Sequence, residues 1–131
     1  MNKHTGIRIM VALLVTLMLL GNITPAAAKK PPEQANWTLM VYIVGDNNLD
    51  EYVPLDIETE LAPTGSNADV SVVALADRLP TAEWSQTLLF YVTQGMEATP
   101  ENAVEDWGEA NMGDPQTLLD FIEWTQANYP A

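Results

Sequence analysis

The sequence predicts an α/β fold whose sheet is incomplete. Two apolar runs of strand length, residues 37–44 and 70–77, flank a segment whose apolar residues follow helical spacing. Runs that are apolar on both faces are typical of strands covered by helices on each side, as in parallel sheets. A helix predicted over residues 114–129 has an apolar face that needs a sheet, and no further strand follows it.

The first half of the chain predicts a strand and a helix. "WTLMVYIV" reads as a buried central strand that ends at Gly45. The helix spans residues 49–61, and Pro54 must lie in its first turn or kink it. Gly65 suits a C-terminal cap. The residues at helical spacing, which we expect to face the core, are Leu49, Tyr52, Val53, Ile57 and Leu61.

The second half predicts two strands and a helix. The strand at 70–77 should pair in parallel with the first, and a strand at 87–95 should return antiparallel through a short link. Residues 96–113 are acidic, contain Gly and Pro, and read as a surface loop. Asp114 should cap the last helix, with Pro115 at its first position. We expect that helix to bury Leu118, Leu119, Ile122 and either Trp124 or Thr125.

The N-terminus has the pattern of a secretory signal peptide. A positive start is followed by the short apolar run "IMVALLVTLMLL" and by small residues at Ala26 and Ala28. We expect cleavage after Ala28, which makes residues 1–28 a signal peptide, 29–36 a linker and 37–131 the folded domain. The predicted location is secreted, either periplasmic or extracellular, with no stable membrane span after cleavage.

Residues 29–131 are strongly acidic. They carry all 18 Asp and Glu residues of the chain against Lys29, Lys30 and Arg78, a net charge of −15. Such a charge disfavours nucleic acid and anionic lipid, and it favours basic peptides or proteins, or calcium.

Nucleophilic catalysis has few possible residues in this sequence. The chain contains no cysteine, and its one histidine, His4, lies in the predicted signal peptide. Residues 29–131 therefore cannot assemble a Cys–His pair, a Ser–His pair or a histidine-based zinc site.

Two blocks of the sequence resemble the clostripain family of cysteine peptidases. They are "WTLMVYIVGDNNLDEY" and "NMGDPQTLLDFIEWTQANYPA", with "VSVVALADR" and a Trp-containing turn at Trp84 between them. The resemblance spans roughly residues 37–131. The stretch "WSQTLLFY" departs from the family, which often has an Arg pair there.

The resemblance implies a caspase-like three-layer sandwich and an exported endopeptidase that cleaves after basic residues, arginine especially. In that family the catalytic His follows the segment that resembles "NYPA", and the catalytic Cys ends the next strand. Neither has a matching position here, so the resemblance implies no catalytic residue in this chain. Some relatives need calcium, which makes calcium a possible cofactor, and some consist of two chains, so a complementing downstream chain is a possible partner.

The cluster from Asp46 to Asp50 has four interpretations. An EF-hand loop requires Gly and Glu where the chain has Glu51 and Ile57. A von Willebrand-type metal site requires hydroxyl residues where Asn48 and Asp50 stand. Asp and Asn also favour tight turns and helix N-caps.

The fourth interpretation places a substrate site at this loop. Ligands of open parallel sheets bind beyond the carboxyl ends of the strands, where Asp77 also lies. In a clostripain-like sheet, Asp46, Asn47 and Asn48 would line the pocket for a basic side chain, a role compatible with capping. We expect Asp77 and Arg78 to form a local ion pair or a strand-end turn.

The leading hypothesis is the N-terminal part of a secreted clostripain-like endopeptidase that lacks the catalytic His and Cys in this chain. The alternatives are a stand-alone acidic binding module for calcium or a basic partner, and an inactive remnant.

Overall fold

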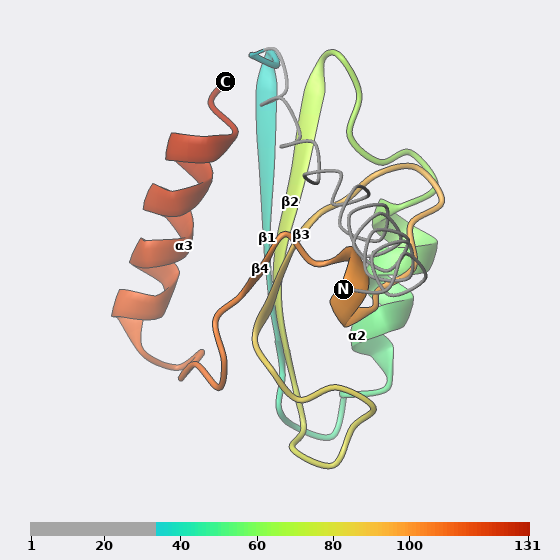
Figure 1. The fold of residues 1–131 in the computed structure, drawn as a ribbon, viewed down its shortest axis with the longest axis vertical. Helices are drawn as coiled ribbons and strands as arrows, with labels where there is room; N and C mark the ends of the chain where they lie inside the picture. The colour runs from blue at the N-terminus through green and yellow to red at the C-terminus, as the bar shows by residue number, and fades with distance from the viewer. Residues whose placement is uncertain (1–33) are drawn as a thin grey trace, which may run out of the picture. The chain divides into compact units, whose positions relative to one another are not determined.

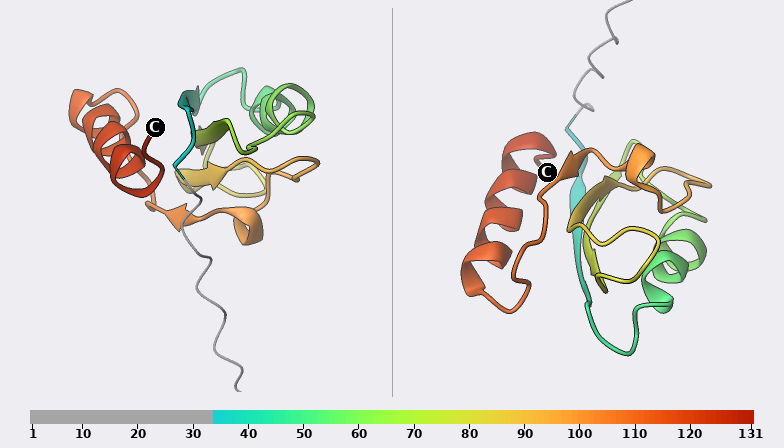
Figure 2. Two further views of the ribbon diagram at one scale, coloured as in Figure 1. Left: turned by 90° about the horizontal axis from the view of Figure 1, so that it is seen from above. Right: turned by 60° about the horizontal axis from the view of Figure 1, so that its bottom comes forward.

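The computed structural model describes residues 34–131, which form an α/β domain around one mixed sheet of four strands in the order β1-β2-β3-β4. Helix α3 covers one face of the sheet, and α2 with the helical turn η1 covers the other (Figure 1, Figure 2). The predicted α/β class is confirmed. The signal peptide and residues 29–33 of the linker lie outside the described residues. The elements are β1 Trp37–Gly45, α2 Tyr52–Leu55, η1 Asp56–Leu61, β2 Val70–Arg78, β3 Leu88–Tyr91, η2 Pro100–Asn102, β4 Glu105–Asp106 and α3 Pro115–Asn128.

Strand β2 lies inside the sheet and is buried on both faces. It pairs in parallel with β1, as predicted, and antiparallel with β3. Successive side chains of a strand point to opposite faces. Val72, Ala74 and Ala76 therefore join the core beneath α2 and η1, whereas Val73 and Leu75 join the core beneath α3.

Strand β1 is an edge strand, and the prediction of a buried central strand is wrong for the described part of the sheet. It pairs with β2 on one side, and no described strand pairs with its other side. Trp37 is 72% exposed, and Leu39 and Val44 are each 48% exposed. The apolar run is thus covered on its two faces only in part, and its outer edge is open.

The helical segment after β1 begins later than expected and changes type. Helix α2 begins at Tyr52, with Pro54 in its first turn as predicted, and continues as the π-helix η1. Val53 and Ile57 are buried, but Leu49 and Tyr52 are about half exposed, so the inward face was predicted only in part. Gly65 closes the segment with a φ of 60°, and its N–H donates to Leu61 O at 2.9 Å.

The region after β3 contains structure that the sequence did not predict. Strand β3 ends at Tyr91, and the expected surface loop includes η2 and the short strand β4, which pairs antiparallel with β3. A strand of two exposed acidic residues has no apolar alternation from which it could be recognised.

Helix α3 begins as predicted and buries its predicted inner face only in part. The Asp114 carboxylate accepts from Gln116 N, and Pro115 is the first helical residue. Thr125 is buried, as one of the predicted alternatives, and so is Phe121, which was not predicted. Leu118 and Leu119 are 41% and 45% exposed, so their predicted burial is wrong for the described domain. None of the helices described is long and apolar enough to cross a membrane.

Replacing Gly45 with alanine should destabilise the domain. An added methyl group would collide with the Val53 side chain and with the backbone carbonyl oxygen of Asp77. Overpacking of this kind costs about 1–3 kcal/mol. We expect Gly45→Ala to lower the free energy of unfolding by that amount in urea titrations followed by tryptophan fluorescence.

The matched control is Gly113→Ala, because its added methyl group would meet only Asn111 Oδ1, at 3.3 Å. Equal stability of the two variants would contradict the close approach of β1, β2 and α2 at Gly45.

Candidate functional site

The loop between β1 and α2 is shaped by Asn47. Its side-chain oxygen accepts from Leu49 N at 2.9 Å, and its amide nitrogen donates to Val44 O at 2.7 Å. The backbone adds a bond from Asn47 N to Gly45 O at 2.7 Å. Both ends of the Asn47 amide are thus used within the loop, as is typical of Asx turns. The predicted turn role is the one that the structure shows for Asn47.

Asp46 lies at a pocket beyond the carboxyl ends of β1 and β2, the edge that the topology predicts for ligands. The pocket has a volume of about 340 Å³. Three of its lining residues are acidic: Asp46, Asp77 and Glu109. The remaining lining residues are Val44, Ala110, Asn111, Met112 and Gly113. Asn48 is exposed and does not line this pocket.

Asp77 is the buried carboxylate of the pocket, with 3% of its surface exposed. The Thr87 hydroxyl donates to Asp77 Oδ1 at 3.1 Å. Burial raises the pKa of the Asp77 carboxyl above its usual value, the bond from Thr87 opposes that rise, and the charges of Glu109 and Asp46 add to it. A buried carboxylate beside two others has a high affinity for a positive charge.

Thr87 and Glu109 complete the site, and the sequence analysis assigned neither of them to it. The fully buried Thr87 hydroxyl also accepts from Ala110 N at 3.1 Å, so it joins the end of β2 to the loop that precedes α3. The Tyr42 hydroxyl donates to Met112 O at 3.1 Å and holds the same loop against β1. No local sequence signal could identify these contacts, because each joins segments far apart in the chain.

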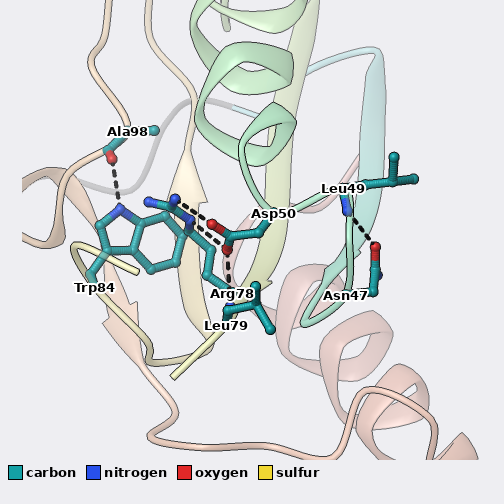
Figure 3. A network of polar contacts seen from close by, with 7 residues as sticks. All are labelled: Asn47, Leu49, Asp50, Arg78, Leu79, Trp84 and Ala98. Carbon is teal, nitrogen blue, oxygen red and sulfur yellow. Dashed lines mark hydrogen bonds and ion pairs between the residues drawn. The ribbon is translucent and has the colours of Figure 1, made fainter. Parts of the chain in front are cut away.

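Arg78 pairs with Asp50 and not with its neighbour Asp77, so of the two predicted alternatives the local ion pair is wrong, whereas Arg78 does end strand β2 before a turn. Alternation along β2 sends Asp77 to the α3 face and Arg78 to the α2 face. Arg78 Nε and Nη2 donate to the two Asp50 oxygens at 3.0 and 2.8 Å, and Leu79 N donates to Asp50 Oδ1 at 2.9 Å (Figure 3). The hydrogen bonds from Arg78 hold the pKa of Asp50 below its usual value.

Trp84 covers the Arg78 guanidinium. Arg78 Cζ lies 5.1 Å from the centre of the Trp84 ring, and the Trp84 indole donates to Ala98 O at 3.1 Å (Figure 3). Trp84 is buried, whereas Trp37 at the start of the edge strand β1 is exposed. The one basic residue of residues 34–131 is therefore held on the face of the sheet opposite Asp77.

The arrangement suits recognition of a cation. The pocket presents carboxylates and no basic residue, and no cysteine or histidine occurs in the described residues. Within residues 34–131 no group of three or more acidic, His or Cys side chains is arranged to hold a metal ion. The carboxylates that line the pocket can pair with a cationic group.

Replacing Asp77 with asparagine should stabilise the domain at neutral pH. Because the folded state raises the pKa of Asp77, the folded state favours the protonated carboxyl, and ionisation above that pKa costs stability. The amide oxygen of asparagine can still accept from Thr87. We expect Asp77→Asn to raise the free energy of unfolding at pH 7 and this gain to shrink as the pH falls through the folded pKa of Asp77.

Thermal unfolding of Asp77→Asn between pH 4 and pH 8 measures this effect. Asp56→Asn removes an exposed carboxylate from η1 and serves as the control. A loss of stability at pH 7 specific to Asp77→Asn would show that the carboxylate is satisfied by the domain itself.

Comparison with known proteins agrees with this architecture. A sequence model described as the clostripain family matches residues 41–131. The chain is also similar to clostripain of Hathewaya histolytica, with 31% identity over 110 residues, which cover 72% of this chain and 21% of that protein. The chain thus spans about a fifth of the length of the relative it matches. By both comparisons, the chain belongs to the clostripain family of cysteine peptidases.

Proposed function

We propose that the chain is the N-terminal part of a secreted clostripain-like cysteine endopeptidase that cleaves after arginine and other basic residues. The chain contributes the first strands of the sheet and an acidic pocket for the substrate. The catalytic cysteine and histidine come from polypeptide outside this chain, since the sequence contains no cysteine and its one histidine precedes the domain.

The observation that carries this proposal is the acidic pocket at the carboxyl ends of β1 and β2. Asp46, Asp77 and Glu109 line a space of about 340 Å³. That volume is at the low end of ligand pockets and suits one side chain better than a long segment of peptide. A guanidinium group has five N–H donors and pairs well with carboxylates in a site of this kind.

The three residues predicted for the substrate site receive different roles in this proposal. Asp46 faces the substrate's basic group together with Asp77. Asn47 acts indirectly, because its amide holds the loop that carries Asp46. Asn48 is exposed and does not line the pocket, so in this proposal it contacts the substrate outside the pocket.

The open edge of β1 supports the part of the proposal that concerns additional polypeptide. Both α2 and α3 contact β1, and the eight large apolar side chains exposed in the described domain all lie on β1, α2, α3 or the loop between β1 and α2. The Thr38 hydroxyl donates to Tyr129 O at 2.7 Å, so the end of α3 lies beside the start of β1 (Figure 1). A following segment can therefore enter beside β1 as a further parallel strand and cover this surface.

The coding sequence beyond codon 131 tests the proposal directly. We expect a continuous frame that encodes a strand ending in His-Gly and, after the next strand, a cysteine. The protein expressed from that frame should hydrolyse a fluorogenic arginine substrate and leave its citrulline counterpart intact. A frame without these residues would contradict the proposal and favour the inactive remnant or the stand-alone binding module.

Calorimetric titration of the 131-residue chain tests the substrate pocket. An arginine-containing peptide should bind, and the same peptide with neutral citrulline should not. Asp46→Asn and Asp77→Asn should each weaken binding by about tenfold or more, because a charge-assisted hydrogen bond contributes about 1.5–3 kcal/mol. The control Asp56→Asn should bind as the unchanged chain does.

Binding should also weaken as the pH falls. The Asp77 carboxyl must be ionised to pair with a guanidinium, and its pKa is raised above the usual value by burial. Equal heats for the arginine and citrulline peptides would argue against a pocket for basic side chains. A binding heat measured when calcium alone is added would favour the alternative of a stand-alone acidic binding module.

A further inference from the structure

The described domain contains one peptide bond that follows a basic residue. Arg78 is the only lysine or arginine in residues 34–131, so Arg78–Leu79 is the only bond there that a peptidase specific for basic residues could hydrolyse. The bond lies at the end of β2, where the chain leaves the sheet for the loop that leads to β3. Strand ends next to loops are places where a peptidase would gain access if the chain could detach.

Asp50 binds both groups that such a peptidase must engage. Its two oxygens accept from Arg78 Nε and Nη2 at 3.0 and 2.8 Å. Asp50 thus binds the guanidinium in the way that an acidic specificity pocket of a peptidase would bind it. Its Oδ1 also accepts from Leu79 N at 2.9 Å, and that nitrogen is the leaving atom of the bond. One carboxylate thus holds the side chain and the amide of the same cleavage position (Figure 3).

The surroundings keep this contact closed. Arg78 is 8% exposed, Trp84 covers its guanidinium, and Arg78 is the last residue of β2 in register with Gly45 of β1. The lowered pKa of Asp50 keeps its carboxylate charged as the solution becomes more acidic. Cleavage therefore requires the end of β2 to leave both Asp50 and Trp84.

We propose that Asp50 masks the Arg78–Leu79 bond and makes residues 34–131 resistant to peptidases that cleave after arginine. Hydrolysis would add water across the C–N bond, leaving a carboxylate on Arg78 and an amino group on Leu79, and the mask prevents this step. The biological role of this mask rests on the proposed function, because the mature protein would then itself be a peptidase that cleaves after arginine. The mask would protect the scaffold from self-digestion.

Limited proteolysis of the 131-residue chain with trypsin tests the mask, with intact-mass spectrometry to identify the products. The native chain should remain uncut at Arg78–Leu79 under conditions that cut the urea-unfolded chain there. Asp50→Asn should raise the rate of cutting at this bond about 100-fold, because it leaves the buried guanidinium without its partner. Asp56→Asn should be cut at the rate of the unchanged chain.

A glutamyl-specific endopeptidase separates local opening from general unfolding. In Asp50→Asn its cutting rate at Glu123, on α3 and away from the Arg78 contact, should stay within about twofold of that for the unchanged chain. A parallel rise at Glu123 would overturn the proposal, since it would show that the variant opens the whole domain and not one bond. Rapid cutting of the native chain at Arg78, or no acceleration in Asp50→Asn, would overturn it as well.

The two proposals can fail separately. Trypsin provides the cleavage in this experiment, so its outcome does not depend on the activity or substrate of the mature protein. A missing downstream frame would leave the mask standing, and an unmasked Arg78 would leave the acidic pocket and its binding test unchanged.

Discussion

Strand β2 is buried on both faces from Ser71 to its end, and its last two residues, Asp77 and Arg78, are charged. A charge can be buried only where a partner or a hydrogen bond compensates for lost hydration. Because the two side chains point to opposite faces, they cannot compensate each other. Each face of the sheet must therefore accommodate one charge by itself, and the segments that surround the end of β2 are arranged accordingly.

The two faces accommodate their charges differently. On the α2 face, Asp50 neutralises Arg78 and Trp84 covers it. On the α3 face, the Asp77 carboxylate accepts a hydrogen bond from the Thr87 hydroxyl and lies near two further negative charges, those of Asp46 and Glu109. The result is a neutral contact on one side and an uncompensated negative pocket on the other. Sequestration of Arg78 also prevents the domain's own basic residue from occupying that pocket.

Much of the backbone fold follows from local patterns in the sequence. The apolar runs identified β1 and β2 and their parallel pairing, and Asp114 with Pro115 identified the start of α3. The sheet edge that carries the acidic pocket was predicted, because the carboxyl ends of parallel strands coincide, but of the three residues assigned to a substrate site only Asp46 lines that pocket.

The failures all concern information that is not local. Whether β1 is central or at an edge depends on strands that the run itself does not encode. The same holds for Leu118 and Leu119. Their residue type and spacing place them on an apolar face of the helix but do not show which surface covers that face. Strand β4 has no apolar pattern, and the partner of Arg78 lies 28 residues away in the chain. Thr87 belongs to the site because it contacts two other segments of the chain. No rule of residue spacing in the sequence predicts such contacts.

The attachment of α3 to β1 has a consequence for the order of folding. Tyr42 bonds to Met112, and Thr38 bonds to Tyr129, across separations of 70 and 91 residues. Contacts between such distant parts of a chain form slowly, because a large loop must close before they can contribute. During synthesis, β1 emerges long before α3, so β1 can pair with β2 well before its α3-facing side is covered. Coverage of β1 by α3 is therefore a late event, because it waits for residues 112–129.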